Sequence, residues 1–442
     1  MAKKQEPIPQ GKQTPYVGCI EGTGQPLRHE SPHALISAPT GSGKTLRLLV
    51  PGALFWRGPR VIISSKTDFL MRVVTHGRIQ DRGPLYVMDL AGELDPSFEW
   101  LQGIDYQMVV SDPCSLIEND DDALAMASLL MKVGALGASD GGDAGGGNDA
   151  FWQTLAAQPL AALLQAGKAS GEGIGWAVQA AAKAEADEDD DNTPSWPYAY
   201  DLIKDTSRHA PDLMTVAGMD AKLKDSLTAT MKSGLTPWLL SNVRGYGHDV
   251  VPFSPSMLEG PYEPTLAIVA PADGVAAGAA VGAVETIIRH WRRGIERGLD
   301  RILLSVDEAV NTCPLPKLPT YITEARGLGV ACVIAVQSTN QMQLRWGETG
   351  AKVLREVFPA AVILPGAPER EMLENAAWWD GEEDVLRDSV GADQKKSSSY
   401  ERLPRTHATD LLPREKGYGR LLLFGQKGHK VELPGIWEFG QE

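Results

Sequence analysis

The sequence predicts an α/β protein whose mainly parallel sheet is interrupted by a helical insertion. Short apolar segments of strand length alternate with segments of helical length in the first 111 residues, and the same alternation resumes at residue 264. This alternation is typical of parallel strands that are joined by helical crossovers. The predicted strands are residues 34–37, 60–65, 85–89, 107–111, 264–271, 301–308, 330–337 and 360–364.

The central part of the chain has a different pattern. Residues 149–254 contain several segments of helical length and no clear strand, and they follow a loop rich in glycine and aspartate at 137–149. An acidic run at 185–191 indicates a second loop. We therefore expect three parts, namely an extended leader at 1–30, a discontinuous α/β domain at 31–148 and 255–442, and an all-α insertion domain at 149–254.

The C-terminal region is expected to contain a mobile segment followed by a hairpin. Residues 391–407 are polar and lack a regular apolar pattern, so they are predicted to be mobile. Residues 419–424 and 430–433 are two short segments of strand character, which predict a terminal hairpin.

Composition excludes several classes of protein. The chain has 442 residues, of which 43% are hydrophobic and 22% charged, as in ordinary soluble globular proteins. No apolar stretch approaches the roughly 18 residues of a transmembrane helix, and the N-terminus lacks the apolar core of a signal peptide. The net charge of −15 argues against a broad basic DNA-binding face but leaves room for a narrow basic channel. The four cysteines form no CxxC pair, so neither zinc nor redox chemistry is predicted.

The first motif follows the first predicted strand and precedes an apolar, helix-like run. It matches the phosphate-binding loop pattern, with Ala38 at the position of the first glycine. Gly41 and Gly43 let the backbone wrap a phosphate without a Cβ in the way, at the start of a helix whose dipole favours anions. Lys44 is expected to reach the β- and γ-phosphates, and the Thr45 hydroxyl to bind Mg²⁺. The predicted ATP-binding residues are Ala38, Pro39, Thr40, Gly41, Ser42, Gly43, Lys44 and Thr45.

The second motif is an apolar strand that ends in two acids, Asp307 and Glu308. This is the pattern of a Walker B strand, the usual partner of a phosphate loop. Asp307 is expected to hold Mg²⁺, directly or through water, and Glu308 to orient and deprotonate the attacking water. The alternative for this strand alone is a pair of acids that merely face solvent.

Two further polar residues are candidates for the same site. Gln337 ends the next strand, and ligands of such sheets lie at the carboxyl ends of strands, so it is placed to contact the γ-phosphate or the water. The alternative for Gln337 is a polar residue satisfied at a strand end. Arg326 lies between these strands, where ring ATPases insert an arginine from a neighbouring subunit, and the alternative is an ordinary surface arginine.

Several segments together resemble the TraG/TraD-type coupling proteins of conjugation and type IV secretion, which belong to the HerA/FtsK superfamily of ring ATPases. The most specific block comprises Val306 to Ala309, Pro314 to Pro319, Glu324 to Gly329 and Ala335 to Ser338. Residues 38–70, the pair Phe151-Trp152, and the segments 360–364 and 421–437 are also similar to the family. The resemblance implies a RecA-like P-loop NTPase domain with an inserted all-α domain.

The resemblance also implies roles and partners. Lys44 and Thr45 match the nucleotide site, Asp307 and Glu308 the Mg²⁺ and hydrolytic acids, Gln337 the γ-phosphate sensor, and Arg326 an arginine finger in trans. The implied protein is an ATP-hydrolysing hexamer, monomeric until DNA or a partner binds, that delivers single-stranded DNA with its relaxase, or a protein cargo, to a type IV secretion channel. Family members usually carry an N-terminal membrane segment. None is predicted here, so we expect the chain to be cytoplasmic and to reach the membrane face through a partner or an anchor outside this sequence.

Two other functions stay open at this point. One is a double-stranded DNA translocase of the FtsK or HerA kind, against which the helical insertion argues. The other is a nucleotide-gated docking scaffold with low turnover, against which Glu308 argues. Candidate DNA contacts, with a solvated face or a subunit contact as the alternative, are Lys222, Lys224, Lys232, Arg244, Arg289, Arg292, Arg293 and Arg297.

Overall fold

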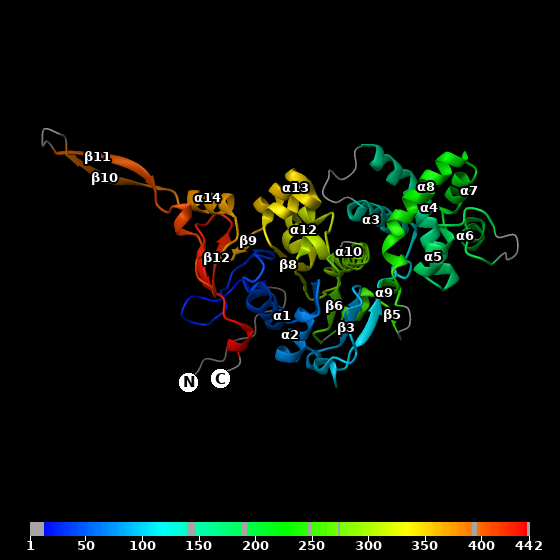
Figure 1. Cartoon of the computed structure of the whole chain (residues 1–442), viewed down its shortest axis with the longest axis horizontal. Helices are drawn as coiled ribbons and strands as arrows, with labels where there is room; N and C mark the ends of the chain where they lie inside the picture. The colour runs from blue at the N-terminus through cyan, green and yellow to red at the C-terminus, as the bar shows by residue number, and fades with distance from the viewer. Residues whose placement is uncertain are drawn as a thin grey trace.

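A single large sheet forms the centre of the protein. The computed structural model describes residues 13–138, 147–186, 192–245, 250–260, 262–272, 275–390 and 396–439. Within these ranges, 11 strands form one sheet in the order β13-β12-β9-β1-β8-β7-β2-β6-β3-β4-β5 (Figure 1). The strands are β1 (Ala34–Ser37), β2 (Arg60–Ser64), β3 (Leu85–Asp89), β4 (Gln107–Val110), β5 (Val251–Pro252), β6 (Thr265–Val269), β7 (Ile302–Val306), β8 (Val330–Val336), β9 (Ala360–Ile363), β12 (Tyr418–Leu423) and β13 (His429–Glu432).

The predicted strands and their parallel pairing are confirmed. Neighbouring strands from β9 to β5 run parallel. Within this sheet, antiparallel pairing is confined to β9 with β12 and to β12 with β13, and the second pair confirms the terminal hairpin. The two-residue strand β5 was not predicted. It lies in the part of the sequence where only helices were expected.

Helices cover both faces of the sheet. Side chains of β1 alternate between two cores, with Leu35 in one and Ala34 and Ile36 in the other, because successive side chains of a strand point to opposite faces. None of the helices in the described ranges is long and apolar enough to cross a membrane. The helices are α1 (Val50–Phe55), α2 (Asp68–Gly77), α3 (Asp120–Ala138), α4 (Gly147–Ser170), α5 (Ile174–Ala180), α6 (Trp196–Ile203), α7 (Ala210–Ala217), α8 (Ala221–Leu235), α9 (Ser241–Arg244), α10 (Ala277–Gly294), α11 (Ala309–Thr312), α12 (Leu318–Glu324), α13 (Gln343–Val357) and α14 (Arg370–Trp379).

The helices α3 to α9 gather at one end of the molecule (Figure 1). Helix α4 packs against α3, α5, α6, α7 and α8. Trp176, Trp196 and Trp238 are almost fully buried there. The Trp238 indole donates to the carbonyl of Ser111 (2.7 Å), just after β4, so the helices are attached directly to the sheet. The boundaries of the predicted domains stay predictions.

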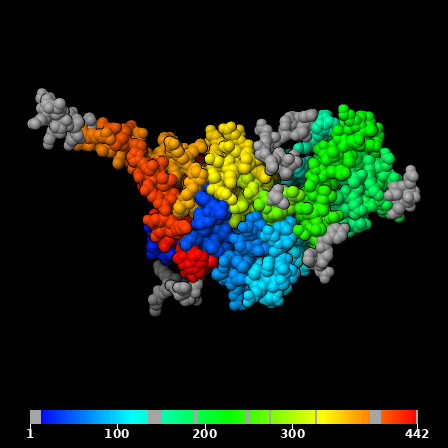
Figure 2. Space-filling model, in the orientation of Figure 1, coloured from blue at the N-terminus to red at the C-terminus, as the bar shows by residue number. Residues whose placement is uncertain are grey.

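A β-hairpin extends from the other end of the molecule (Figures 1 and 2). It consists of β10 (Glu382–Val390) and β11 (Lys396–Pro404) in antiparallel register. Within the segment 391–407, which was expected to be mobile, residues 396–404 form the strand β11, whereas 391–395 lie outside the described residues. Cross-strand ion pairs support the hairpin, between Arg387 and Glu401 (2.8 Å) and between Arg402 and Glu382 (2.9 Å). These pairs depend on register, which the polar sequence of β11 does not reveal.

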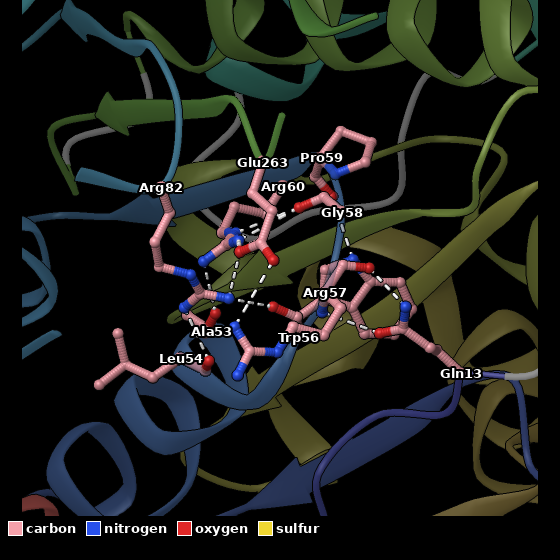
Figure 3. Close-up of polar contacts among 10 residues, drawn as sticks. All are labelled: Gln13, Ala53, Leu54, Trp56, Arg57, Gly58, Pro59, Arg60, Arg82 and Glu263. Carbon is pink, nitrogen blue, oxygen red and sulfur yellow. Dashed lines mark hydrogen bonds and ion pairs between the residues drawn. The ribbon is translucent and has the colours of Figure 1, made fainter. Parts of the chain in front are cut away.

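A buried ionic cluster lies at the amino ends of β2, β3 and β6 (Figure 3). Glu263 forms ion pairs with the guanidinium groups of Arg60 (2.6 Å) and Arg82, and a longer one with Arg57 (3.6 Å). Arg60 is fully buried, and this burial lowers its pKa to about 10. Backbone carbonyls accept further guanidinium hydrogens, including those of Ala53 from Arg60 (2.9 Å) and of Leu54 from Arg82 (2.8 Å).

Candidate nucleotide-binding site

The phosphate loop lies at the carboxyl end of β1, in the middle of the sheet. The N–H of Ala38 donates to the carbonyl of Val336 (3.0 Å), so the loop begins where the pairing of β1 with β8 ends. Gly41 (φ 77°) and Gly43 (φ 91°) both have the left-handed backbone that favours glycine. No atom lies within 4 Å of the position that a Cβ of Gly41 would take. The backbone is therefore open on that side, as a phosphate cradle requires.

The helix after the loop begins with a change of register. Residues Thr45–Leu49 form a π-helical turn, in which the N–H of Val50 donates to the carbonyl of Thr45, before α1 continues as an α-helix. Pro51 has no N–H and cannot continue the α-helical ladder, and the register change lies directly before it. Such turns occur frequently at functional sites. The sequence predicted a helix here but not this turn.

Lys44, Thr45 and Asp307 come together between β1 and β7. The Lys44 ammonium lies 2.9 Å from Oδ1 of Asp307, and the Thr45 hydroxyl donates to Oδ2 (3.2 Å). Burial raises the pKa of Asp307, although the charge of Lys44 opposes this shift. The geometry thus joins the two motifs that the sequence identified separately.

Glu308 and Gln337 complete the same group. The Gln337 amide donates to Oε1 of Glu308 (3.0 Å), and Lys44 lies 3.4 Å from the same oxygen. Glu308 has a left-handed backbone (φ 53°), which is unfavourable for a residue with a side chain. Strain of this kind is concentrated at functional sites. Arg326 lies in a short 3-10 turn (Ala325–Leu328), and its assignment as an arginine finger stays a prediction.

Sequence reasoning missed one residue next to this site. Glu369 lies in the loop between β9 and α14 and is almost completely buried, with 4% of its surface exposed. It accepts hydrogen bonds from the hydroxyl of Ser37 (2.6 Å) and from the backbone N–H of Thr339 (2.8 Å). No motif indicated it, because it stands several residues after its strand, in a loop rich in proline and glycine.

The four predicted DNA-binding arginines of α10 and its C-terminal extension all have acidic partners. The ion pairs are Arg289 and Arg293 with Asp122 (3.0 and 3.5 Å), Arg292 with Glu324 (3.2 Å) and Arg297 with Glu259 (3.4 Å). Partners of this kind reduce the positive charge that a nucleic acid would meet. This arrangement attaches the α10 region to neighbouring segments, and a role in DNA binding stays a prediction.

Comparisons with known proteins show which family and which fold this chain resembles. A family model described as the TraM recognition site of TraD and TraG matches residues 301–416. Comparison with curated proteins gave no match. Among solved structures, the fold is similar to that of the bacterial conjugative coupling protein TrwBdeltaN70 in an unbound form, with a TM-score of 0.63 and 18% identity over 96% of this chain and 89% of that chain.

Two further structures of the plasmid coupling protein TrwB are similar to this chain. One is a complex with ADP and Mg²⁺ (TM-score 0.63, 20% identity, 97% of this chain and 89% of that chain). The other contains the non-hydrolysable ATP analogue ADPNP (TM-score 0.62, 19% identity, 97% of this chain and 90% of that chain). The fold is thus that of a RecA-like P-loop NTPase domain with an all-α domain, and the resemblance to TraG/TraD-type coupling proteins is confirmed in sequence over residues 301–416 and in fold over nearly the whole chain.

Proposed function

We propose that this protein is an ATP-hydrolysing coupling protein, which recruits relaxase-bound DNA or protein cargo and drives or gates its transfer into a type IV secretion channel. The observation that carries the enzymatic part is the convergence of Lys44, Thr45, Asp307, Glu308 and Gln337 at the carboxyl end of β1, β7 and β8. The similarity to conjugative coupling proteins in family model and fold supports the cargo-transfer part.

The residues present fit a nucleotide with Mg²⁺. The open backbone at Gly41 and the ammonium of Lys44 suit the β- and γ-phosphates. The Thr45 hydroxyl and the Asp307 carboxylate, already 3.2 Å apart, would hold the metal. When bound, Mg²⁺ neutralises charge that develops on the phosphates. TrwB in complex with ADP and Mg²⁺ has the same fold, which supports these cofactors.

Hydrolysis then requires a water that is aligned with the γ-phosphate. The Glu308 carboxylate accepts the proton of this water, and the Gln337 amide holds the carboxylate in place through its 3.0 Å hydrogen bond. Lys44, which contacts both acids, moves toward the phosphates when they bind. Glu308 is thereby released from its ion pair and becomes free to act as the base.

The remaining features of the proposal concern assembly. Arg326 would come from a neighbouring copy and stabilise charge in the transition state, which requires a ring, here a hexamer. The α-helical domain at 149–254 would dock the relaxase or other cargo. The ring would bind single-stranded DNA through charge rather than sequence, at the cytoplasmic face of the membrane.

The test measures ATPase rate per subunit against protein concentration, with and without single-stranded DNA. We expect the rate to rise with concentration and with DNA, because each site would need Arg326 from a second copy. Glu308→Gln gives the background, and Arg326→Ala is expected to remove the dependence on concentration. A wild-type rate equal to that of Glu308→Gln would contradict the enzymatic proposal and favour a docking scaffold.

Deleting residues 149–254 distinguishes coupling from duplex translocation. Coupling predicts that ATPase activity persists while binding of relaxase is lost. A double-stranded DNA translocase would instead lose movement along a duplex, which a triplex-displacement assay measures.

A further inference from the structure

Glu369 connects two segments of the candidate site from outside it. Its Oε1 accepts from the Ser37 hydroxyl (2.6 Å) and from the backbone N–H of Thr339 (2.8 Å), and its Oε2 accepts from the Thr339 hydroxyl (2.5 Å). Both carboxylate oxygens are therefore occupied by donors from two separate parts of the chain. Glu369 contacts neither the phosphate loop nor Gln337 through these bonds.

The two connected segments are those that carry the phosphate loop and Gln337. Ser37 ends β1 and directly precedes Ala38, the first residue of the loop. Thr339 stands two residues after Gln337, at the start of a short 3-10 turn. The backbone bond from Ala38 to Val336 (3.0 Å) joins the same strands just before they separate. Glu369 continues this connection beyond the end of the sheet.

A carboxylate is well suited to this position because each of its partners is a donor. Hydrogen bonds to a charged acceptor are roughly twice as strong as neutral ones. A glutamine would have the same size but would turn an N–H group toward one of these donors. The isosteric change therefore breaks the connection while it leaves the packing of a fully enclosed side chain nearly unchanged.

We propose that Glu369 is a positioning residue for ATP hydrolysis, which fixes Gln337 relative to the phosphate loop; this inference rests on the proposed ATPase function. Gln337 reaches Glu308 across 3.0 Å, so a shift of its strand end moves the amide that orients the catalytic carboxylate. Misplacement of a reacting group by about 1 Å can cost on the order of 100-fold in rate. The nucleotide itself is held by Lys44, Thr45 and the loop backbone, which Glu369 does not contact.

The test compares kcat and KM for ATP with the Kd for ADPNP in a set of matched variants. Glu369→Gln is expected to lower kcat by about 10- to 100-fold while the Kd for ADPNP changes by less than about 3-fold. Thr339→Val, which loses the hydroxyl donor, is expected to lower kcat by a smaller factor. Thr339→Ser keeps both donors and is the matched control, with kcat close to that of the wild type.

Each outcome decides the inference. A general loss of structure would change kcat, KM and Kd together, so thermal unfolding is recorded for every variant, and Thr339→Val carries the test if Glu369→Gln does not fold. The inference is overturned if Glu369→Gln or Thr339→Val keeps wild-type kcat, or if only the Kd for ADPNP changes. If the wild type is no faster than Glu308→Gln, the ATPase proposal fails first, and the role of Glu369 fails with it.

Discussion

Buried charges lie at both the amino ends and the carboxyl ends of the central strands. One acid is shared by several cations at the amino end, whereas one cation is shared by two acids at the carboxyl end. At the amino end, Glu263 is shared by Arg60 and Arg82, and backbone carbonyls accept further hydrogens of both guanidinium groups. At the carboxyl end, Asp307 and Glu308 share a single cation, Lys44. Burial raises the pKa of Asp307, and Glu308 has an unfavourable backbone conformation (φ 53°).

We interpret this difference as one between charges that hold the fold and charges that would contact the ligand of the proposed site. Removing one partner of a buried ion pair destabilises the fold, because an isolated charge is left inside. A strained site that holds several acids makes the folded protein less stable than it could be, a cost that active sites commonly carry. Removing one of these charges is therefore expected to stabilise the protein. Neutralising an acid should therefore have opposite effects on stability at the two ends.

The largest expected effect is at the amino end. Replacing Glu263 with alanine leaves the fully buried Arg60 without an anionic partner, and such a loss usually lowers the free energy of unfolding by about 3–5 kcal/mol. Chemical denaturation with urea measures this change. Glu263→Gln keeps the volume and an acceptor, so a smaller loss is expected. A loss below about 1 kcal/mol for Glu263→Ala would mean that the cluster does not hold the fold.

The second prediction concerns Asp307→Asn at the carboxyl end, where the change is expected to stabilise the protein while ATPase activity is lost. Because burial raises the pKa of Asp307, the folded protein binds a proton there more tightly than the unfolded chain. Its contribution to stability is therefore most favourable at low pH and becomes unfavourable as pH rises from the unfolded pKa through the raised folded pKa.

The gain from Asp307→Asn should accordingly be present at neutral pH, at about 0.5–2 kcal/mol, and disappear at acidic pH. Denaturation curves at several pH values measure it. Glu308→Gln serves as the neighbouring control and is expected to change stability less. A gain that is independent of pH would contradict the role of burial.

The third prediction tests the backbone of Glu308. Glycine adopts a φ of 53° without the steric cost that other residues incur, so Glu308→Gly is expected to stabilise the fold by about 1 kcal/mol. Glu308→Gln keeps the same backbone requirement and should not show this gain. Both variants are expected to lose turnover. If they are equally stable by urea denaturation, the backbone of Glu308 stores no strain.

The sequence predicted the carboxyl end far better than the amino end. The loop at Ala38 to Thr45 and the acids Asp307 and Glu308 follow strands that are recognisable as apolar runs, and parallel strands bring their carboxyl ends to one edge. The sheet was also predictable, because β1, β7 and β8 are buried along their whole length and consist almost entirely of apolar residues. Local pattern was sufficient to place a candidate site residue wherever that residue directly ends a strand.

Residues that act across long separations were not predictable in this way. Arg60 begins a strand as a charged residue, and only the fold brings it to Glu263, 203 positions away. Glu369 meets Ser37 across 332 positions, from a loop without a motif. The hairpin of β10 and β11 depends on cross-strand register rather than on apolar alternation. In each case the role of the residue depends on a partner that is distant in the sequence, so the residue's own sequence context does not reveal it.

The smallest expected effect separates the exposed edge of the amino-end cluster from its buried centre. The Arg57 side chain is 68% exposed and lies 3.6 Å from Glu263, so its ion pair is screened by water. Its positive charge also opposes those of Arg60 and Arg82 and lowers their pKa values, after the larger effect of burial.

Arg57→Ala is therefore expected to change the free energy of unfolding by less than about 0.5 kcal/mol, because the lost attraction and the relieved repulsion nearly cancel. The backbone bond from Arg57 N–H to the Gln13 side chain (2.8 Å) persists in this variant. Urea denaturation of Arg57→Ala and Glu263→Ala under the same conditions compares their free energies of unfolding. A loss in Arg57→Ala as large as that in Glu263→Ala would show that the whole cluster, rather than its buried pairs, stabilises this end of the sheet.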